Sequence, residues 1–281
     1  MKNFLCFLVL FIVNLPLYVM AGVINLGSAE QYIFATASES QWSGNLLLGS
    51  EAHVFGSVAA SNTLELGGGV IVEGDACAGA INNWGATVAG ATGSCTDFSQ
   101  LAQDINTAAI EAESLTTQDL GNVTDSLTIA GGGKQAFLIS DLILAGGETL
   151  TLTGDVNDSF VFNILGTAQL GSGANILLEG GISAQNVIFN FLANPTSHSF
   201  EIGGANISGT FLSSGRSFIL GDGATLNNSR FYSTESIIAN VQDVRFSASQ
   251  SVTVPEPTTV LLFTMSIMLI GFQRFTLSKS D

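Results

Sequence analysis

Basic residues are scarce in this chain. Only 7 of its 281 residues are Lys or Arg, against 23 Asp or Glu, and the formal net charge is −16 at pH 7. Proteins that bind nucleic acid neutralise phosphates with clustered Lys and Arg, so nucleic acid is excluded as a partner. We interpret the acidic excess as a means of keeping the protein soluble, with a calcium-dependent role as the alternative.

Histidines and catalytic motifs are almost absent. The two histidines, His53 and His198, are isolated in strand-like sequence and are expected on the surface. No nucleophile-elbow, zinc-protease, phosphate-loop or dinucleotide motif occurs, and the glycine triplets lack the Lys-Ser/Thr of a phosphate loop. We therefore expect no enzyme, no cofactor and no metal. Two alternatives stay open: a carboxylate pair for glycoside hydrolysis, and a calcium turn at Asp155, Asn157 and Asp158 whose spacing is incomplete.

Cysteines are few, and their positions indicate one disulfide. The chain has 3, of which Cys6 lies in an N-terminal apolar run. The remaining pair, Cys77 and Cys95, is expected to be bonded in an oxidising compartment. The bridge would close a stretch rich in Gly and Ala and contribute roughly 3 kcal/mol.

The N-terminal residues have the pattern of a signal peptide. Residues 4–20 are almost wholly apolar and are followed by Ala21, which completes a small-x-small cleavage pattern. We predict a signal peptide over residues 1–21, cleaved before Gly22, with a retained membrane anchor as the alternative. The mature body, residues 22–254, would then be exported.

A glycine-containing motif recurs along the body and predicts a β-solenoid. It joins two aliphatic positions through small residues, and apolar residues alternate with polar ones around it. Copies begin at Leu48, Leu66, Ile129, Leu144, Leu170, Ile202 and Leu220. Some copies are 18 residues apart, which suits one strand-turn coil of a stack, whereas the other spacings require insertions. A β-sandwich of short strands is the alternative.

One segment has helical instead of strand periodicity. Over residues 97–115 the apolar positions are spaced by three and four, which places them on one stripe of a helix. Thr96 is the expected N-cap, and Asp97 lies favourably at the positive end of the helix dipole. Asp104 is assigned to the opposite, polar face. The predicted fold is therefore mainly β: an irregular β-solenoid with one long α-helix packed along its side, plus terminal hydrophobic targeting helices.

The C-terminal residues resemble a known sorting device. Pro255, Glu256 and Pro257 precede an uncharged segment and then Arg274, followed by TLSKSD. The apolar part, residues 260–272, is short for a permanent span of about 20 residues. This arrangement is similar to PEP-CTERM signals, although its basic tail is looser than is usual. The resemblance implies that residues 255–281 are recognised and removed by an exosortase at the envelope or surface of a Gram-negative bacterium. An ordinary single-pass anchor is the alternative.

The body resembles exported β-solenoid domains. The segments that carry the resemblance are NLLLGSEAHVFGSVAASNTLELGGGVIVEGD, DFSQL, DSFVFNI and NVIFNF followed by ISGTFLSSG. They are similar to choice-of-anchor A proteins and to ice-binding-like adhesive domains, in which a long helix also lies beside a solenoid. The resemblance implies a structural or binding protein that touches a membrane only through its targeting segments.

Two functions follow from this interpretation. The first is a structural or adhesive protein of the extracellular matrix, whose rigid face contacts polysaccharide or another surface ligand. The alternative is an ice-binding protein that orders water on a flat β-face. Thr149, Thr151 and Thr153 give one candidate row of this kind, and the corresponding places in other coils are assigned to Ser199-Glu201 and Ser217-Ile219.

Overall fold

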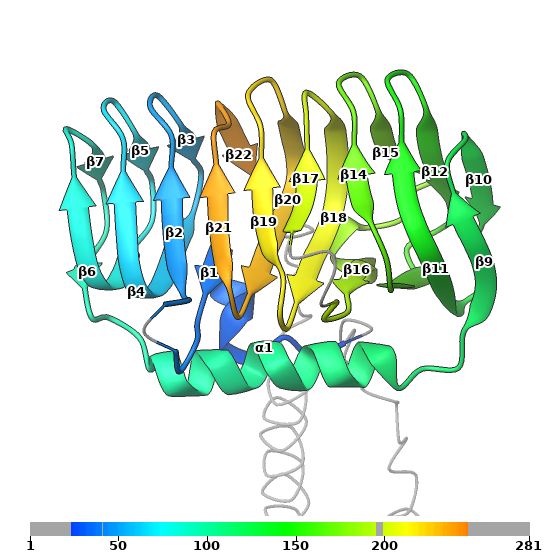
Figure 1. The fold of residues 1–281 in the computed structure, drawn as a ribbon, viewed down its shortest axis with the longest axis horizontal. Coiled ribbons are helices and arrows are strands. Elements are labelled where there is room, and N and C mark those ends of the chain that lie inside the picture. The colour runs from blue at the N-terminus through cyan, green and yellow to red at the C-terminus, as the bar shows by residue number, and fades with distance from the viewer. Residues whose placement is uncertain (1–23, 41, 195–198, 247–281) are drawn as a thin grey trace, which may run out of the picture.

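The computed structural model describes residues 24–40, 42–194 and 199–246. Strand pairing is parallel in every ladder, and successive coils stack into one elongated β-solenoid (Figure 1). A single long helix, α1 (Phe98–Glu113), runs along one side of the stack. The predicted mainly β architecture with one helix is thus confirmed, and a sandwich of facing antiparallel sheets is wrong.

Each coil contributes to up to three sides of the solenoid: the helix side, which lies against α1 and includes β1 (Tyr32–Thr36), the front side, which includes β2 (Asn45–Leu48), and the rear side, which includes β12 (Thr149–Thr153) (Figure 1). Long strands bend around a corner and belong to two sides, as β4 (Ser57–Leu66) does when Val58 pairs on the helix side and Leu64 on the front side.

The strands are: β1 (Tyr32–Thr36), β2 (Asn45–Leu48), β3 (His53–Val54), β4 (Ser57–Leu66), β5 (Ile71–Val72), β6 (Ala76–Asn83), β7 (Thr87–Val88), β8 (Thr92–Gly93), β9 (Gln118–Val123), β10 (Leu127–Ala130), β11 (Lys134–Leu144), β12 (Thr149–Thr153), β13 (Ser159–Ile164), β14 (Ala168–Leu170), β15 (Asn175–Glu179), β16 (Val187–Phe191), β17 (Ser199–Ile202), β18 (Asn206–Ser213), β19 (Ser217–Leu220), β20 (Thr225–Ser233), β21 (Ser236–Ala239) and β22 (Asp243–Arg245). Two short 3-10 helices are η1 (Gly27–Gln31) and η2 (Ala184–Asn186).

The order of coils in space differs from their order in the sequence. The chain begins in the middle of the stack and winds to the end formed by β6, β7 and β8; α1 then carries it back to the end formed by β9 and β10 (Figure 1). From there it winds inward until β21 pairs with β2. This helical crossover explains the longest gap between motif copies.

Most motif copies form one corner of the solenoid. Leu48 pairs with Leu66, and Leu170 pairs with both Leu144 and Ile202, so coils of unequal length still align. The 18-residue offsets are therefore the registers of adjacent coils. The copy at Ile129 is an exception, because Ile129 pairs with Leu152 and lies on the rear side.

The core is a continuous column of inward-pointing side chains. On the helix side it includes a ladder of stacked phenylalanines, with neighbouring ring centroids 4.7–5.6 Å apart. Its members are Phe137, Phe162, Phe189, Phe211, Phe231 and Phe34. Parallel, in-register pairing places the same residue type on the same inner position of successive coils, which is what allows the rings to stack.

The helix is fixed to the solenoid by apolar packing and by side-chain amides. Its buried stripe includes Leu101 and Ile105, which pack in one cluster with residues of the helix-side strands. Asn163 and Asn190 donate to the carbonyls of Ala112 and Ala109 at 2.8 and 3.0 Å. These bonds tie the last two turns of α1 to β13 and β16.

Two details of the predicted helix are wrong. The N-cap is Asp97, not Thr96, because the Asp97 carboxylate accepts from the backbone N–H groups of Ser99 and Gln100 at 3.0 and 3.1 Å. Asp104 does not simply face solvent, since it accepts from both the backbone N–H and the hydroxyl of Ser28 at 2.7 Å. The predicted terminal hydrophobic helices lie outside the described residues.

Candidate functional site

The front and rear sides of the solenoid are the candidate binding surfaces. The helix side is covered by α1, so all five residues of β1 are buried. The front and rear strands alternate instead between buried and outward positions, as Thr149–Thr153 does. A surface ligand would therefore meet the outward side chains of the front or the rear.

The rear side presents the three predicted threonines. In β12 the side chains of Leu150 and Leu152 enter the core and are fully buried, which leaves Thr149, Thr151 and Thr153 pointing outward. The three are partly exposed and are spaced two residues apart along one strand, about 6.6 Å between neighbours.

The neighbouring strands extend this row into a grid. The outward pairs are Thr149 with Asn175, Thr151 with Thr128 and Leu177, and Thr153 with Ala130 and Glu179. The row from Thr149 continues through Asn206 to Thr225. We call these outward residues of β10, β12, β15 and the first parts of β18 and β20 the rear grid: Thr128, Ala130, Thr149, Thr151, Thr153, Asn175, Leu177, Glu179, Asn206, Thr225 and Asn227.

Thr and Asn predominate in the rear grid, and its spacing is regular across β10, β12 and β15. Its only charged member is Glu179. The ladders from β10 through β12 to β15 contain no register shift. The amide of Asn175 donates to the hydroxyl of Thr149 at 3.4 Å and to the carbonyl of Gly173 at 3.0 Å, which orients it across the row.

The correspondence between coils expected from the sequence is wrong. Ser199 and Ser217 lie on the front side, in β17 and β19, and do not extend the threonine row. The true neighbours, including Thr128 and Asn175, were missed because coils here differ in length and no constant offset relates them.

The other half of the rear side is charged. His53 is not isolated: its Nε2 lies 2.8 Å from an Oε1 of Glu73, and its ring stacks on Phe55 at 3.8 Å. The guanidinium of Arg245 lies 3.8 Å from the centroid of the same Phe55 ring. This charged cluster borders the rear grid, since Arg245 pairs with Asn227.

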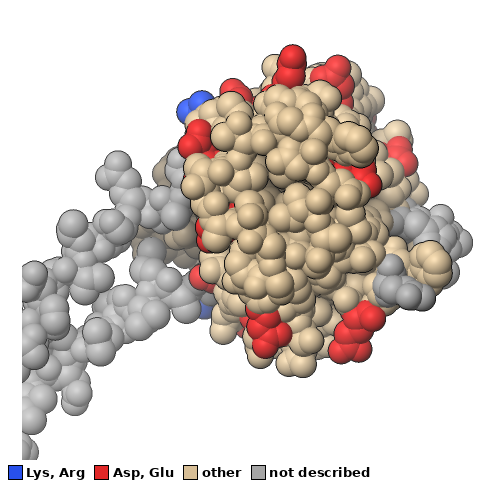
Figure 2. Space-filling model, turned by 90° about the vertical axis from the view of Figure 1, so that its left-hand side faces the viewer, with Lys and Arg blue, Asp and Glu red and all other residues tan. Residues whose placement is uncertain are grey.

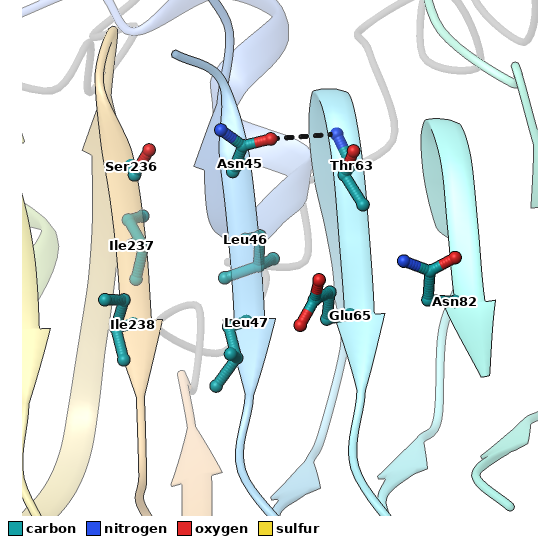
Figure 3. Close-up of a pocket in the computed structure, with 9 residues that line it drawn as sticks. All are labelled: Asn45, Leu46, Leu47, Thr63, Glu65, Asn82, Ser236, Ile237 and Ile238. Carbon is teal, nitrogen blue, oxygen red and sulfur yellow. Dashed lines mark hydrogen bonds between the residues drawn. The ribbon is translucent and has the colours of Figure 1, made fainter. Parts of the chain in front are cut away.

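The front side carries a shallow groove of about 370 Å³ (Figure 3). Leu47 lies between Glu65 and Ile238 in the outward row, and Asn45 accepts from the backbone N–H of Thr63 at 3.3 Å. The groove is lined by Asn45, Leu46, Leu47, Thr63, Glu65, Asn82, Ser236, Ile237 and Ile238. Glu65 is its only titratable side chain, so the groove has no acid-base pair.

The remaining sequence candidates are structural. Cys77 and Cys95 form a disulfide, with a Cα–Cα distance of 5.1 Å. The carboxylate of Asp158 accepts from the backbone N–H groups of Gly133 and Asp155, and these bonds hold its pKa below the ordinary value. Within the described ranges, no group of three or more His, Cys, Asp or Glu side chains is placed to hold a metal ion.

Several predicted residues lie outside the described part of the chain. They are His198, the cleavage pair Ala21 and Gly22, and the sorting residues Pro255, Glu256, Pro257 and Arg274. Among the helices that are described, none combines the length and apolarity needed to cross a membrane.

Comparisons with known proteins point to one family. The chain is similar to an ice-binding protein from an Antarctic biological consortium, with 19% identity, a TM-score of 0.53, and coverage of 79% of this chain and 89% of that one. It is also similar to an ice-binding protein from an Antarctic Flavobacteriaceae bacterium, with 19% identity, a TM-score of 0.56, and coverage of 79% of this chain and 47% of that one. A third similar structure is a glycosylated ice-binding protein from an Arctic yeast, with 15% identity, a TM-score of 0.56, and coverage of 82% of this chain and 97% of that one.

These likenesses show a shared fold. No curated protein matches the chain. The profile of the ice-binding-like family matches residues 77–244, from β6 to β22 and including α1 and the whole rear grid. The chain belongs to the ice-binding-like family.

Proposed function

We propose that this protein binds ice through the rear grid. The observation that carries the proposal is the in-register set of outward side chains on β10, β12 and β15. Most of them are Thr or Asn, and the others are Ala130, Leu177 and the one charged residue, Glu179. Membership of the ice-binding-like family supports the same function.

The grid has the geometry of a two-dimensional template. Strands repeat about every 4.8 Å across it, and outward residues about every 6.6 Å along it. Hydroxyl and amide groups can hydrogen-bond to water at these intervals. The Thr methyl groups form no hydrogen bonds, so water molecules beside them can hydrogen-bond to one another. Beneath the grid, Leu150, Leu152 and Ile176 are buried, so the backbone that sets the spacing is packed against the core.

The low charge of the rear grid, in which Glu179 is the one charged member, favours this half of the rear side over the other. Ionised side chains order their own hydration shells strongly, and these shells do not match an ice lattice. The cluster of His53, Glu73 and Arg245 is therefore less suitable than the grid. The front side is also less suitable, because its outward row includes Glu65 and Glu201.

Thermal hysteresis of a matched pair of variants tests this assignment. Thr151→Tyr places a bulky ring in the centre of the grid, and Gln169→Tyr places the same ring at an exposed position of the front side. We expect Thr151→Tyr to lose most of the thermal hysteresis and Gln169→Tyr to retain it. Both variants should unfold at temperatures close to that of the wild type. Equal loss in the two variants, or retention in Thr151→Tyr, would show that the rear grid is not the ice-binding surface.

The sequence supports a further proposal about location. We propose that the protein is exported, has no catalytic role and is sorted by an exosortase to the cell envelope or surface. The PEP-CTERM-like residues Pro255, Glu256 and Pro257 support it. An adhesive role toward polysaccharide has less support than ice binding.

A further inference from the structure

One end of the solenoid is free of charge although the chain is strongly acidic. This end coil consists of β6, β7 and β8, and residues 76–96 contain no Asp, Glu, Lys or Arg. Figure 2 views this end: acidic side chains lie around its rim, and its centre is uncharged. In a chain with a net charge of −16, such a surface is an exception.

The apolar core is open at this end. Ile81 and Val88 belong to the inward rows that contain Leu64 and Val72 one coil further in. Leu64 and Val72 are fully buried, whereas Ile81 and Val88, together with Ala86, are only partly buried. The difference arises because no coil of the described chain stacks on the outer side of the end coil.

The backbone of the end coil is also unpaired on its outer side. In the described part of the chain, β7 pairs only with β5, and β6 is covered on its outer side only at Ala76 and Cys77, where β8 pairs with it. Exposed strand edges are usually protected by charged residues or proline, because free N–H and C=O groups template further pairing. Neither kind of residue occurs between positions 76 and 96.

We infer that a second copy of this chain docks on this end, so that two solenoids join end to end through their uncharged coils. Pairing of identical ends is two-fold symmetric and closes after two copies. It covers Ile81, Ala86 and Val88 of each copy and supplies strand partners to the free edges. It also points the acidic bodies of the two copies away from each other, which reduces their mutual repulsion.

The opposite end is a poorer partner. It is formed by β9 and β10, and its segment carries the exposed carboxylates of Asp119 and Asp125. Stacking that end on the uncharged end would bring these carboxylates toward an open apolar core. It would also leave free ends on both molecules and give filaments instead of dimers.

Sedimentation velocity on the purified protein, with its processing state fixed by intact mass, tests this inference. From micromolar to millimolar concentration we expect a reversible monomer-dimer equilibrium. Ile81→Glu should weaken dimerisation at least about tenfold, since it places an unpaired charge in the contact. Leu127→Glu, the control at the partly buried core position of β10, should leave it unchanged. If Ile81→Glu fails to fold, Ala86→Glu replaces only a methyl group and serves the same purpose.

Small-angle scattering completes the test, because an end-to-end dimer has about twice the maximum dimension of the monomer. A protein that stays monomeric at all concentrations overturns the inference. So does a dimer that survives both Ile81→Glu and Ala86→Glu, one that is lost in Leu127→Glu, or one of side-by-side dimensions. The inference is independent of ice binding, which is measured by hysteresis of the same variants.

Discussion

The guanidinium of Arg216 provides a sharp test of how the coils are held together. Arg216 is fully buried and donates to the carbonyls of Leu192, Gly166 and Leu165 at 2.7, 2.6 and 2.5 Å. These acceptors follow β13 and β16, so one side chain joins the turns of adjacent coils. Burial lowers the pKa of Arg216, and the nearby carboxylate of Asp141 acts in the opposite direction.

The substitution Arg216→Met fills similar space but donates no hydrogen bond. The Leu165 carbonyl keeps the side-chain amide of Asn194 as a donor at 2.6 Å, so the carbonyls of Leu192 and Gly166 are the two that lose a side-chain donor. Each buried acceptor that loses its donor costs about 1–3 kcal/mol, so the lower end of this range for two carbonyls gives a loss of about 2 kcal/mol. With a urea dependence of about 2 kcal/mol per M, the unfolding midpoint falls by about 1 M.

Arg245→Met is the matched control. Arg245 is exposed and its guanidinium lies over the ring of Phe55, a contact worth about 0.5–1 kcal/mol. Urea unfolding followed by circular dichroism compares the two variants with the wild type. An Arg216→Met variant that loses no more stability than Arg245→Met would refute the assigned role of the three hydrogen bonds.

The remaining predictions concern the disulfide, an acid-sensitive contact and sorting. Mass spectrometry after alkylation without reductant should find no free thiol at Cys77 or Cys95, and two labelled thiols would contradict the bond. Burial alone would raise the pKa of Asp104, but hydrogen bonds from Ser28 and Gln100 outweigh it and hold the pKa below the ordinary value of a carboxyl group. The ionised Asp104 carboxylate therefore stabilises the fold at pH values above its unfolded pKa, and this stabilisation is lost as pH falls through the folded pKa. The difference in unfolding free energy between wild type and Asp104→Asn, measured by urea unfolding, should therefore narrow below about pH 4. A difference that does not change with pH would contradict this role of Asp104. Glu256→Ala should block removal of residues 255–281, and a surface-exposed wild-type protein that retains Phe272 by intact mass would refute sorting by cleavage.

Local patterns in the sequence predicted the elements well. Alternation around the glycine motif indicates strands, and the spacing from Leu101 to Ala112 indicates the helix, because each pattern reflects which side chains enter a core. The 18-residue offset between Leu48 and Leu66 is a true register, since no insertion separates these coils.

Neighbours in space were predicted poorly. The first coil lies between the second coil and the last one, since Leu48 pairs with both Leu66 and Ala239. Nothing local in the sequence specifies this order, which depends on α1 carrying the chain from end to end. Of the rear grid, the sequence predicted Thr149, Thr151 and Thr153. The neighbours of Thr151, Thr128 and Leu177, were missed for a different reason, because they align with it only after coils of unequal length are stacked.

Partition into slowly grown ice tests the central claim most directly. The purified protein in buffer is allowed to freeze partly, and its concentrations in the ice and in the remaining liquid are compared. Binding through the rear grid predicts enrichment of the wild type and of Gln169→Tyr in the ice, with Thr151→Tyr left in the liquid. Exclusion of the wild-type protein from the ice, to the same extent as an unrelated acidic protein, would contradict the account.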